Sequence, residues 1–356
     1  MFQKLTVIGG GATGLTAAGY FSMLGLDVTL YDSEAYASIL NSVTQAGGIL
    51  MRGAIRGFGT PRKVTMNPAE AIPEAEVIFV DVMSDRHEEV ARVIAPYLHD
   101  GQHILIMPGN LGSFIFRRVF KEMNISADVT VSEKEGNFCP CRLSDQAEVT
   151  VGMFRGAGGL ISSLPASDTQ RAIEAMEGPC HFKAGKNVLE GTLEAGNVIM
   201  HIGSTLLSAT AIDHQQNEFS LFKYAFTPST VTLTAKIREE RLQVIEACGF
   251  TEHLNNMGMI DKLLHPQDHP ENHYFRDYMD GPYAVNHRYL NEDCSCGGAL
   301  AVSMGRRLGF EMPLMTSLLT IAGAINGRDY LKEGRTLENL GFDESMTLEE
   351  IFAKIA

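Results

Sequence analysis

The sequence predicts an α/β protein in which an N-terminal, doubly wound parallel sheet precedes a mostly α-helical second domain. Residues 1 to about 150 alternate short β-branched runs with helical stretches, which is typical of a doubly wound sheet. Beyond residue 185 the pattern changes to longer helical segments. A chain of 356 residues is also long enough to need two hydrophobic cores. We therefore expect one domain over residues 1–185 and another over residues 186–356.

In the first domain, apolar runs predict strands and the stretches between them predict helices. The expected strands are Lys4–Ile8, Asp27–Tyr31, Val77–Val82, His103–Met107, Val129–Ser132 and Glu148–Gly152. Helices are expected over Thr13–Leu24 and His87–Leu98, and the crossovers have the length that parallel strands require. Gly47–Lys63 is rich in glycine and basic residues, so we expect an irregular excursion there.

In the second domain, four helical segments are expected. They are Ala195–Ile212, Pro228–Cys248, Gly297–Leu308 and Pro313–Asn326. Pro228 suits a first helical position behind Thr227 as the cap, and Gly249 suits the end of the same helix, because proline is favoured at helix starts and glycine just beyond helix ends. Near the C-terminus, Thr347 and Glu350 have the spacing of a capping box, which predicts one more helix start.

Composition and charge exclude several classes of function. The 43 acidic side chains outnumber the 29 basic ones, which gives a net charge of −14 and disfavours a nucleic acid partner. Glycines interrupt the apolar N-terminus, whereas a signal peptide requires a continuous apolar stretch. No apolar run elsewhere reaches the length that a membrane-spanning helix requires. Six cysteines in so long a chain do not form a disulfide framework. We expect a cytoplasmic protein with reduced thiols and no membrane partner.

A glycine-rich turn follows the first predicted strand and opens the first predicted helix. Gly9, Gly11 and Gly14, with Ala12 and Thr13 before the last of them, have the spacing G-x-G-x-x-G. The first glycine permits a tight turn, the second lets a diphosphate approach the backbone, and the third lets helix and strand pack closely. The helix N-terminus adds N–H donors for the phosphates. Residues 1–185 are therefore predicted to form a Rossmann-type dinucleotide-binding domain.

Asp32, just after the second predicted strand, indicates which coenzyme is used. An acidic side chain at this position accepts hydrogen bonds from the adenosine ribose and repels a 2′-phosphate, so we favour NAD(H). NADP(H) stays open because Arg52, Arg56 and Arg62 follow in the basic excursion. A flavin is less favoured, since no second Gly-Asp motif lies near the C-terminus.

A polar stripe runs along the predicted helix Ala195–Ile212. Asn197, His201, Ser204 and Ser208 are spaced i, i+4, i+7 and i+11 and share one helix face. A solvent-exposed face normally carries Lys and Glu, so an uncharged stripe indicates a cleft. His201 is a candidate for proton transfer because imidazole titrates near neutral pH. A structural histidine held by hydrogen bonds is the alternative.

An acidic partner would orient the His201 ring, fix its tautomer and stabilise the imidazolium. Asp293, at the end of the segment Arg288–Asp293, is the best candidate for that partner. It also lies just ahead of the predicted helix Gly297–Leu308, so helix capping is the alternative interpretation of Asp293.

Four motifs occur in order along the chain: Gly9–Gly14, Asn197–His201, Arg288–Asp293 and Gly334–Gly341. Together they resemble the opine dehydrogenases, the octopine/nopaline dehydrogenase family that includes bacterial N-(carboxyalkyl)amino acid dehydrogenases. The resemblance spans nearly the whole chain. It implies a dinucleotide domain followed by a helical substrate-binding and catalytic domain over residues 186–356. It also implies an enzyme that reversibly condenses the amine of an amino acid with an α-keto acid and reduces the imine with NAD(P)H.

The resemblance assigns roles to residues of the second domain. His201 matches the catalytic histidine of the family, and Asp293 matches its acidic partner. Arg288 lies where a family arginine contacts a substrate carboxylate, and arginine can bind a carboxylate through two hydrogen bonds. Asn197, one turn before His201, is a candidate for binding the substrate or the nicotinamide amide.

The substrates themselves are less well defined. Glu133 matches an acidic position near the amino acid substrate, but Lys134 and Glu135 after it depart from the small residues of the family. That departure leaves open which amino acid and which keto acid are used. The expected partners are a small-molecule amino acid and an α-keto acid, and a homodimer through the helical domain stays open.

Two other functions and a metal site are the alternatives to this interpretation. A keto acid reductase of the ketopantoate reductase type would have lysine in place of His201. A nucleotide-binding sensor would need no proton-transfer pair. The Cys-x-Cys pairs Cys139/Cys141 and Cys294/Cys296 are less diagnostic of metal than Cys-x-x-Cys, so we expect no metal.

Overall fold

The computed structural model describes residues 2–251, 256–270 and 273–356. The chain forms two compact units, Met1–Gly191 together with Ala356, and Thr192–Ile355. They divide within helix α7 (Val188–Glu194). The predicted fold class is confirmed, because unit 1 contains a largely parallel sheet and unit 2 is helical. The boundary that we expect after residue 185 stays a prediction.

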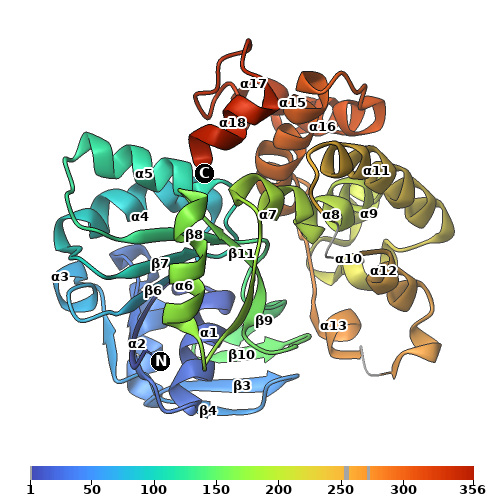
Figure 1. Ribbon diagram of the computed structural model, residues 1–356. Helices are drawn as coiled ribbons and strands as arrows, with labels where there is room; N and C mark the ends of the chain where they lie inside the picture. The colour runs from blue at the N-terminus through green and yellow to red at the C-terminus, as the bar shows by residue number, and fades with distance from the viewer. Residues whose placement is uncertain (1, 252–255, 271–272) are drawn as a thin grey trace. The chain divides into compact units, whose positions relative to one another are not determined.

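Unit 1 is built on an eight-stranded sheet (Figure 1). Across the sheet its strands are β12 (His181–Ala184), β11 (Gly158–Ser163), β8 (Thr130–Lys134), β7 (His103–Ile106), β6 (Val77–Val80), β1 (Lys4–Ile8), β2 (Asp27–Tyr31) and β5 (Lys63–Thr65). Neighbouring strands are parallel except β8 and β11. The order reverses at β1, which lies between β2 and β6. Open α/β sheets bind their ligands beyond the carboxyl ends of the strands at such a point.

The strands form because their β-branched and aromatic side chains are buried on both faces of the sheet. Successive side chains point to opposite faces, so Val7 and Phe79 belong to one core cluster, and Ile8 and Ile78 to another. Helices of the first cluster are α1 (Ala12–Met23), α2 (Ala37–Ala46) and α6 (Thr169–Met176); those of the second are α3 (Pro68–Ala71), α4 (His87–Ile94) and α5 (Gly112–Glu122).

A second, four-stranded sheet corrects two sequence predictions. Its strands, in order, are β4 (Gly57–Gly59), β3 (Ile49–Gly53), β10 (Glu148–Val151) and β9 (Cys141–Asp145). Most of Gly47–Lys63 is therefore regular, and Glu148–Gly152 does not extend the main sheet. The glycines that indicated a loop serve close packing instead, since a Cβ at Gly59 would clash with the backbone of Gly19 in α1.

Unit 2 is a set of helices (Figure 1). They are α8 (Gly196–Leu207), α9 (Ala209–Gln215), α10 (Leu221–Tyr224), α11 (Pro228–Ala247), α12 (Asn256–Leu264), α13 (His273–Tyr278), α14 (Arg288–Asp293), α15 (Ala299–Arg307), α16 (Pro313–Asn326), α17 (Tyr330–Glu333) and α18 (Leu348–Ile355). Thr227 caps α11 by accepting a bond from the Thr230 N–H, and Gly249 after it has φ +66°. In the part of the chain that the structure describes, no single helix could cross a membrane; the bent pair Val188–Leu207 and Ala209–Glu218 reaches the required length and apolarity only together.

Two predicted helices have different ends in the structure. Ala195–Ile212 is not one helix, because it breaks at Ser208 between α8 and α9. The helix expected over Gly297–Leu308 begins earlier in the structure than predicted. α14 continues through a π-helical turn, Cys294–Gly298, directly into α15. Asp293 is therefore inside continuous helix, with φ −68° and ψ −36° and no capping hydrogen bond from its side chain. The capping interpretation of Asp293 is wrong.

Candidate active site

The glycine-rich turn of unit 1 joins β1 to α1 at the carboxyl edge of the sheet. Gly9 has φ +142°, and a Cβ there would clash with the Asp81 carbonyl oxygen. A Cβ at Gly14 would clash with the Gly9 carbonyl, so both glycines are required by packing. Gly11 differs, because a Cβ there would meet no described atom within 4 Å.

That space at Gly11 fits the approach of a diphosphate. Gly11 is the N-cap of α1, and no side chain caps the helix there. The backbone N–H groups at a helix start, Ala12 and Thr13 among them, are donors that an anion can satisfy. The residues present therefore fit the dinucleotide that the motif predicts. Their contact with a coenzyme stays a prediction.

Asp32 is buried at the end of β2, with 1% of its surface exposed. Its carboxylate accepts bonds from the Gly10 N–H at 2.7 Å and the Ser33 N–H at 2.7 Å. Arg86 adds two more, from Nη2 at 2.8 Å and Nη1 at 3.3 Å. Asp32 thus holds the glycine-rich turn to the end of β2. Its predicted contact with the adenosine ribose stays a prediction.

Arg86 is the residue at this edge that sequence reasoning missed. The three arginines considered there bond elsewhere: Arg52 pairs with Glu148 at 2.7 Å, Arg62 pairs with Asp27, and Arg56 donates to the Gly53 carbonyl. Arg86 lies 54 positions from Asp32 in the sequence. No local pattern could have linked the two, although an arginine just after the strand β6 was the available signal.

The structure places Glu133 at the end of β8, buried with 3% exposed. Its Oε2 accepts from the Leu111 N–H at 2.8 Å and its Oε1 from the Ser113 N–H at 2.7 Å. Leu111 has φ +65° and precedes α5. Glu133 thus fixes the loop at the start of α5. The amino acid contact predicted for it stays a prediction.

Lys134 and Glu135 form a buried ion pair at 3.2 Å. Next to this pair, burial raises the pKa of the Asp81 carboxyl well above its usual range.

Cys139 lies against Cys141. The hydrogen bond between the two thiols lowers the pKa of Cys141 to about 7, and burial acts in the opposite direction. Among the described residues, no group of three or more His, Cys, Asp or Glu side chains is arranged to hold a metal ion.

His201 and Asp293 meet in unit 2. His201 Nδ1 lies 2.8 Å from Asp293 Oδ2, and each residue is only 5% exposed. His201 comes from α8 and Asp293 from the last position of α14. The helices approach closely there because Gly297 in the π-helical turn has no side chain, and a Cβ on it would lie 2.5 Å from Val198. π-Helical turns are frequent at functional sites.

Aromatic rings fix the orientation of His201. The Tyr289 ring stacks on the imidazole, with centroids 3.7 Å apart and planes 20° apart. Phe222 meets the imidazole edge to face at 6.1 Å. Asp293 engages the Nδ1 atom of this ring. The sequence did not single out Tyr289, although its place inside the Arg288–Asp293 motif was a usable signal.

The Asp293 carboxyl titrates far from its usual range. Burial raises its pKa to about 8, and the positive charge of Arg288 acts in the opposite direction. Below that pH the Asp293 carboxyl holds a proton, and above it the carboxyl loses that proton. A proton-transfer pair works best when it titrates near the operating pH. The pair can therefore act as an acid or a base close to neutral pH.

Arg288 lies one residue before Tyr289, with its guanidinium over that ring at 5.5 Å and 27% of its side chain exposed. Glu292 is 3.9 Å away, beyond hydrogen-bond distance. Asn197 is half-buried one turn before His201. The polar stripe is only partly directed outward, because the Ser204 hydroxyl donates to the Met200 carbonyl of its own helix.

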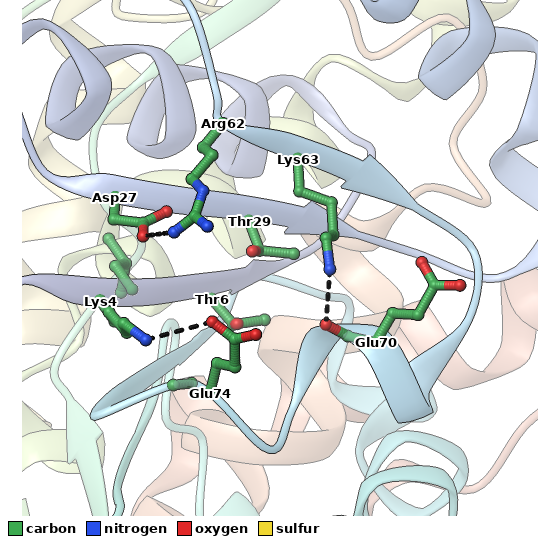
Figure 2. A pocket seen from close by; sticks show the side chains of 10 residues that line it. Lys4, Thr6, Asp27, Thr29, Arg62, Lys63, Glu70 and Glu74 are labelled. Carbon is green, nitrogen blue, oxygen red and sulfur yellow. Dashed lines mark hydrogen bonds and ion pairs between the residues drawn. The ribbon is translucent and has the colours of Figure 1, made fainter.

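A separate hollow lies at the amino ends of β1 and β2, the opposite edge of the sheet from the glycine-rich turn (Figure 2). Its charged side chains pair with one another, Lys4 with Glu74 and Arg62 with Asp27, while Lys63 donates to the Glu70 carbonyl. Most of these groups are exposed, and we assign this hollow no role.

A dinucleotide-type glycine turn in one unit and a buried His–Asp pair in a helical unit define an oxidoreductase that depends on a nicotinamide dinucleotide. Residues 184–326 match the family model described as NAD/NADP octopine/nopaline dehydrogenase, alpha-helical domain. Over this helical segment, and at lower identity over nearly the whole chain, the protein is similar to the opine dehydrogenases.

Relatives and solved structures are similar to this chain over most of its length. An opine dehydrogenase of Arthrobacter sp. (strain 1C) is 29% identical over 350 residues, which is 95% of each chain. An octopine dehydrogenase solved with NADH and agmatine has a TM-score of 0.71 at 18% identity, covering 99% of this chain and 98% of that one. A ketopantoate reductase of Ralstonia eutropha JMP134 has a TM-score of 0.60 at 16% identity, over 91% and 98% of the two chains.

Proposed function

We propose that this enzyme joins the amine of an amino acid to an α-keto acid and reduces the resulting imine, giving an N-(carboxyalkyl)amino acid, and that it also runs the reverse reaction. The buried His201–Asp293 pair, with Nδ1 and Oδ2 2.8 Å apart, carries this proposal. The condensation requires proton transfer, and the Asp293 carboxyl of this pair titrates close to neutral pH. Similarity to the opine dehydrogenases supports the reaction type.

In the proposed reaction, the amine adds to the keto carbonyl and the carbinolamine loses water. His201 supplies the proton that leaves with that water, and Asp293 stabilises the charged ring. When bound, the dinucleotide would supply the hydride that adds to the carbon of the protonated imine and so gives the secondary amine. The stacked ring of Tyr289 keeps the imidazole in one orientation, so that the proton is delivered to one position.

Arg288 is proposed to bind a substrate carboxylate. Its guanidinium is held over Tyr289 at 5.5 Å, while Glu292 stays 3.9 Å away. Both substrates of the proposed reaction carry a carboxylate, and a guanidinium can bind one through two parallel hydrogen bonds. Asn197 is proposed to bind the substrate or the nicotinamide amide from one turn before His201. The solved octopine dehydrogenases hold NADH with L-arginine or with pyruvate, and substrates of this class are proposed here.

For the coenzyme, residues 1–185 are proposed to bind NAD(H) or NADP(H), with the diphosphate at Gly9, Gly11, Ala12, Thr13 and Gly14. The charge of Asp32, taken alone, would favour NAD(H). A related dehydrogenase of known structure binds NADP+, which keeps NADP(H) in consideration. Cytoplasmic location and a homodimer stay predictions.

Initial rates of NADH and NADPH oxidation test the function. Single amino acids would be paired with pyruvate, glyoxylate, oxaloacetate or 2-oxoglutarate. We expect fast oxidation only when an amino acid and a keto acid are both present. A keto acid reductase is the second candidate, because the fold is also similar to ketopantoate reductase. Oxidation with a keto acid alone, unaffected by any amino acid, would favour that candidate over ours.

A further inference from the structure

The carboxylate of Asp32 has no acceptor position left for a ribose. Two carboxylate oxygens offer about four lone-pair sites. The Gly10 and Ser33 N–H groups occupy two of them at 2.7 Å each, and the two Nη atoms of Arg86 occupy the others at 2.8 and 3.3 Å. A ribose diol could bond to Asp32 only by displacing Arg86. The side chain at this edge that can still bond to a ligand is therefore Arg86 and not Asp32.

The Arg86 guanidinium is held in a fixed position. It bonds to Asp32 through both Nη atoms, lies over the Tyr36 ring at 5.1 Å, and contacts the Ser33 hydroxyl through Nη2 at 3.5 Å. The second hydrogen of Nη1 has no acceptor among the described residues. The Ser33 hydroxyl accepts from Arg86 and keeps its own hydrogen to donate. Two donors thus stand together at the end of β2.

Charge at this edge favours an anion more than the sequence indicates. The bidentate pair with Arg86 offsets the negative charge of Asp32, which alone would repel a 2′-phosphate. Glu89 competes for Arg86 through Nε at 3.4 Å, but its side chain is 53% exposed, and exposed pairs are weak. The planar fork of arginine matches phosphate geometry.

We propose that Arg86, positioned by Asp32, determines coenzyme selectivity: with the Ser33 hydroxyl it receives the 2′-phosphate of NADP(H), so that the enzyme binds NADPH at least as tightly as NADH. This inference rests on the proposed use of a nicotinamide dinucleotide. It names a specificity residue that lies outside the glycine motif and replaces the selectivity expected from Asp32.

Dissociation constants for NADPH and NADH test the proposal without any substrate. They would be measured by nucleotide fluorescence on the wild-type protein, on Arg86→Gln and on Arg92→Gln. Arg92 is the matched control, because it lies in the adjoining helix α4 and pairs with Glu88 and Glu122 but not with Asp32. Loss of a charge-assisted bond weakens binding about tenfold or more. We expect that loss for NADPH in Arg86→Gln, about threefold or less for NADH, and no change in Arg92→Gln.

Two further measurements keep the proposal testable if Arg86→Gln folds poorly. Arg86→Lys keeps the charge but not the fork, and should weaken NADPH binding without abolishing it. Adenosine 2′,5′-bisphosphate should bind the wild-type protein more tightly than AMP. A wild-type preference for NADH of about tenfold or more, or an unchanged NADPH/NADH ratio in the Arg86 variants, would overturn the role of Arg86 and leave the proposed reaction standing. Failure of both coenzymes to bind would overturn both.

Discussion

Replacing Asp293 by asparagine tests the proton-transfer pair most selectively. Asparagine keeps the size of the side chain, and its oxygen can still accept a bond from His201 Nδ1 over the observed 2.8 Å. What it removes is the titratable carboxyl that can exchange a proton with His201, in a site where both residues are 95% buried. Because general acid–base catalysis contributes about 10²- to 10⁴-fold, we expect kcat to fall by about that factor, with the coenzyme dissociation constant unchanged.

Steady-state kinetics in both directions, with coenzyme titrations, provide the measurement for Asp293→Asn. Asp329→Asn is the matched control: Asp329 is exposed and caps α17, and asparagine caps helices equally well. This control should keep wild-type kcat. A kcat for Asp293→Asn within about twofold of wild type, far below the expected loss, would refute the reasoning from the buried pair.

Three other predictions follow from the same structure. Because burial raises the pKa of Asp293 to about 8, the proton-donating direction (reduction) should slow above that pH and oxidation should speed up, as pH–rate profiles would show; parallel profiles in both directions would contradict this. Gly11→Ala places its Cβ where no described atom lies within 4 Å, so thermal melting should be unchanged while coenzyme binding weakens, and the reverse result would count against a diphosphate at this turn. Glu133→Gln removes charge from a carboxylate that accepts two backbone bonds and should cost about 1–3 kcal/mol of folding free energy by denaturant titration, whereas an unchanged stability with a raised KM would favour a substrate contact.

Much of the main sheet could be predicted from sequence because local patterns determine it. Lys4–Ile8 and Asp27–Tyr31 have the predicted bounds, since each is an apolar run bounded by turn residues. The second sheet could not be predicted, because β3 pairs with β10, almost 100 positions away in the sequence. The glycines that pack β4 against α1 have the same local appearance as loop glycines. The break at Ser208 likewise leaves no clear signal, since apolar residues continue on both sides.

The candidate site shows the same division between local and distant information. The glycine turn and the imidazole on α8 could be found from spacing. Pairing His201 with Asp293 across 92 positions depended on chemical reasoning and on the family resemblance. The bond between Arg86 and Asp32 depends on two loops meeting at the carboxyl edge of the sheet, which only the folded chain brings together.

The identity of the reaction product tests the central claim most directly. The enzyme would be supplied with NADH or NADPH, a keto acid and an amino acid whose amine carries heavy nitrogen, and the product would be analysed by mass spectrometry. Our account predicts a secondary amine dicarboxylate that retains the heavy nitrogen, formed in step with coenzyme oxidation. An unlabelled hydroxy acid as the reduced product would contradict it.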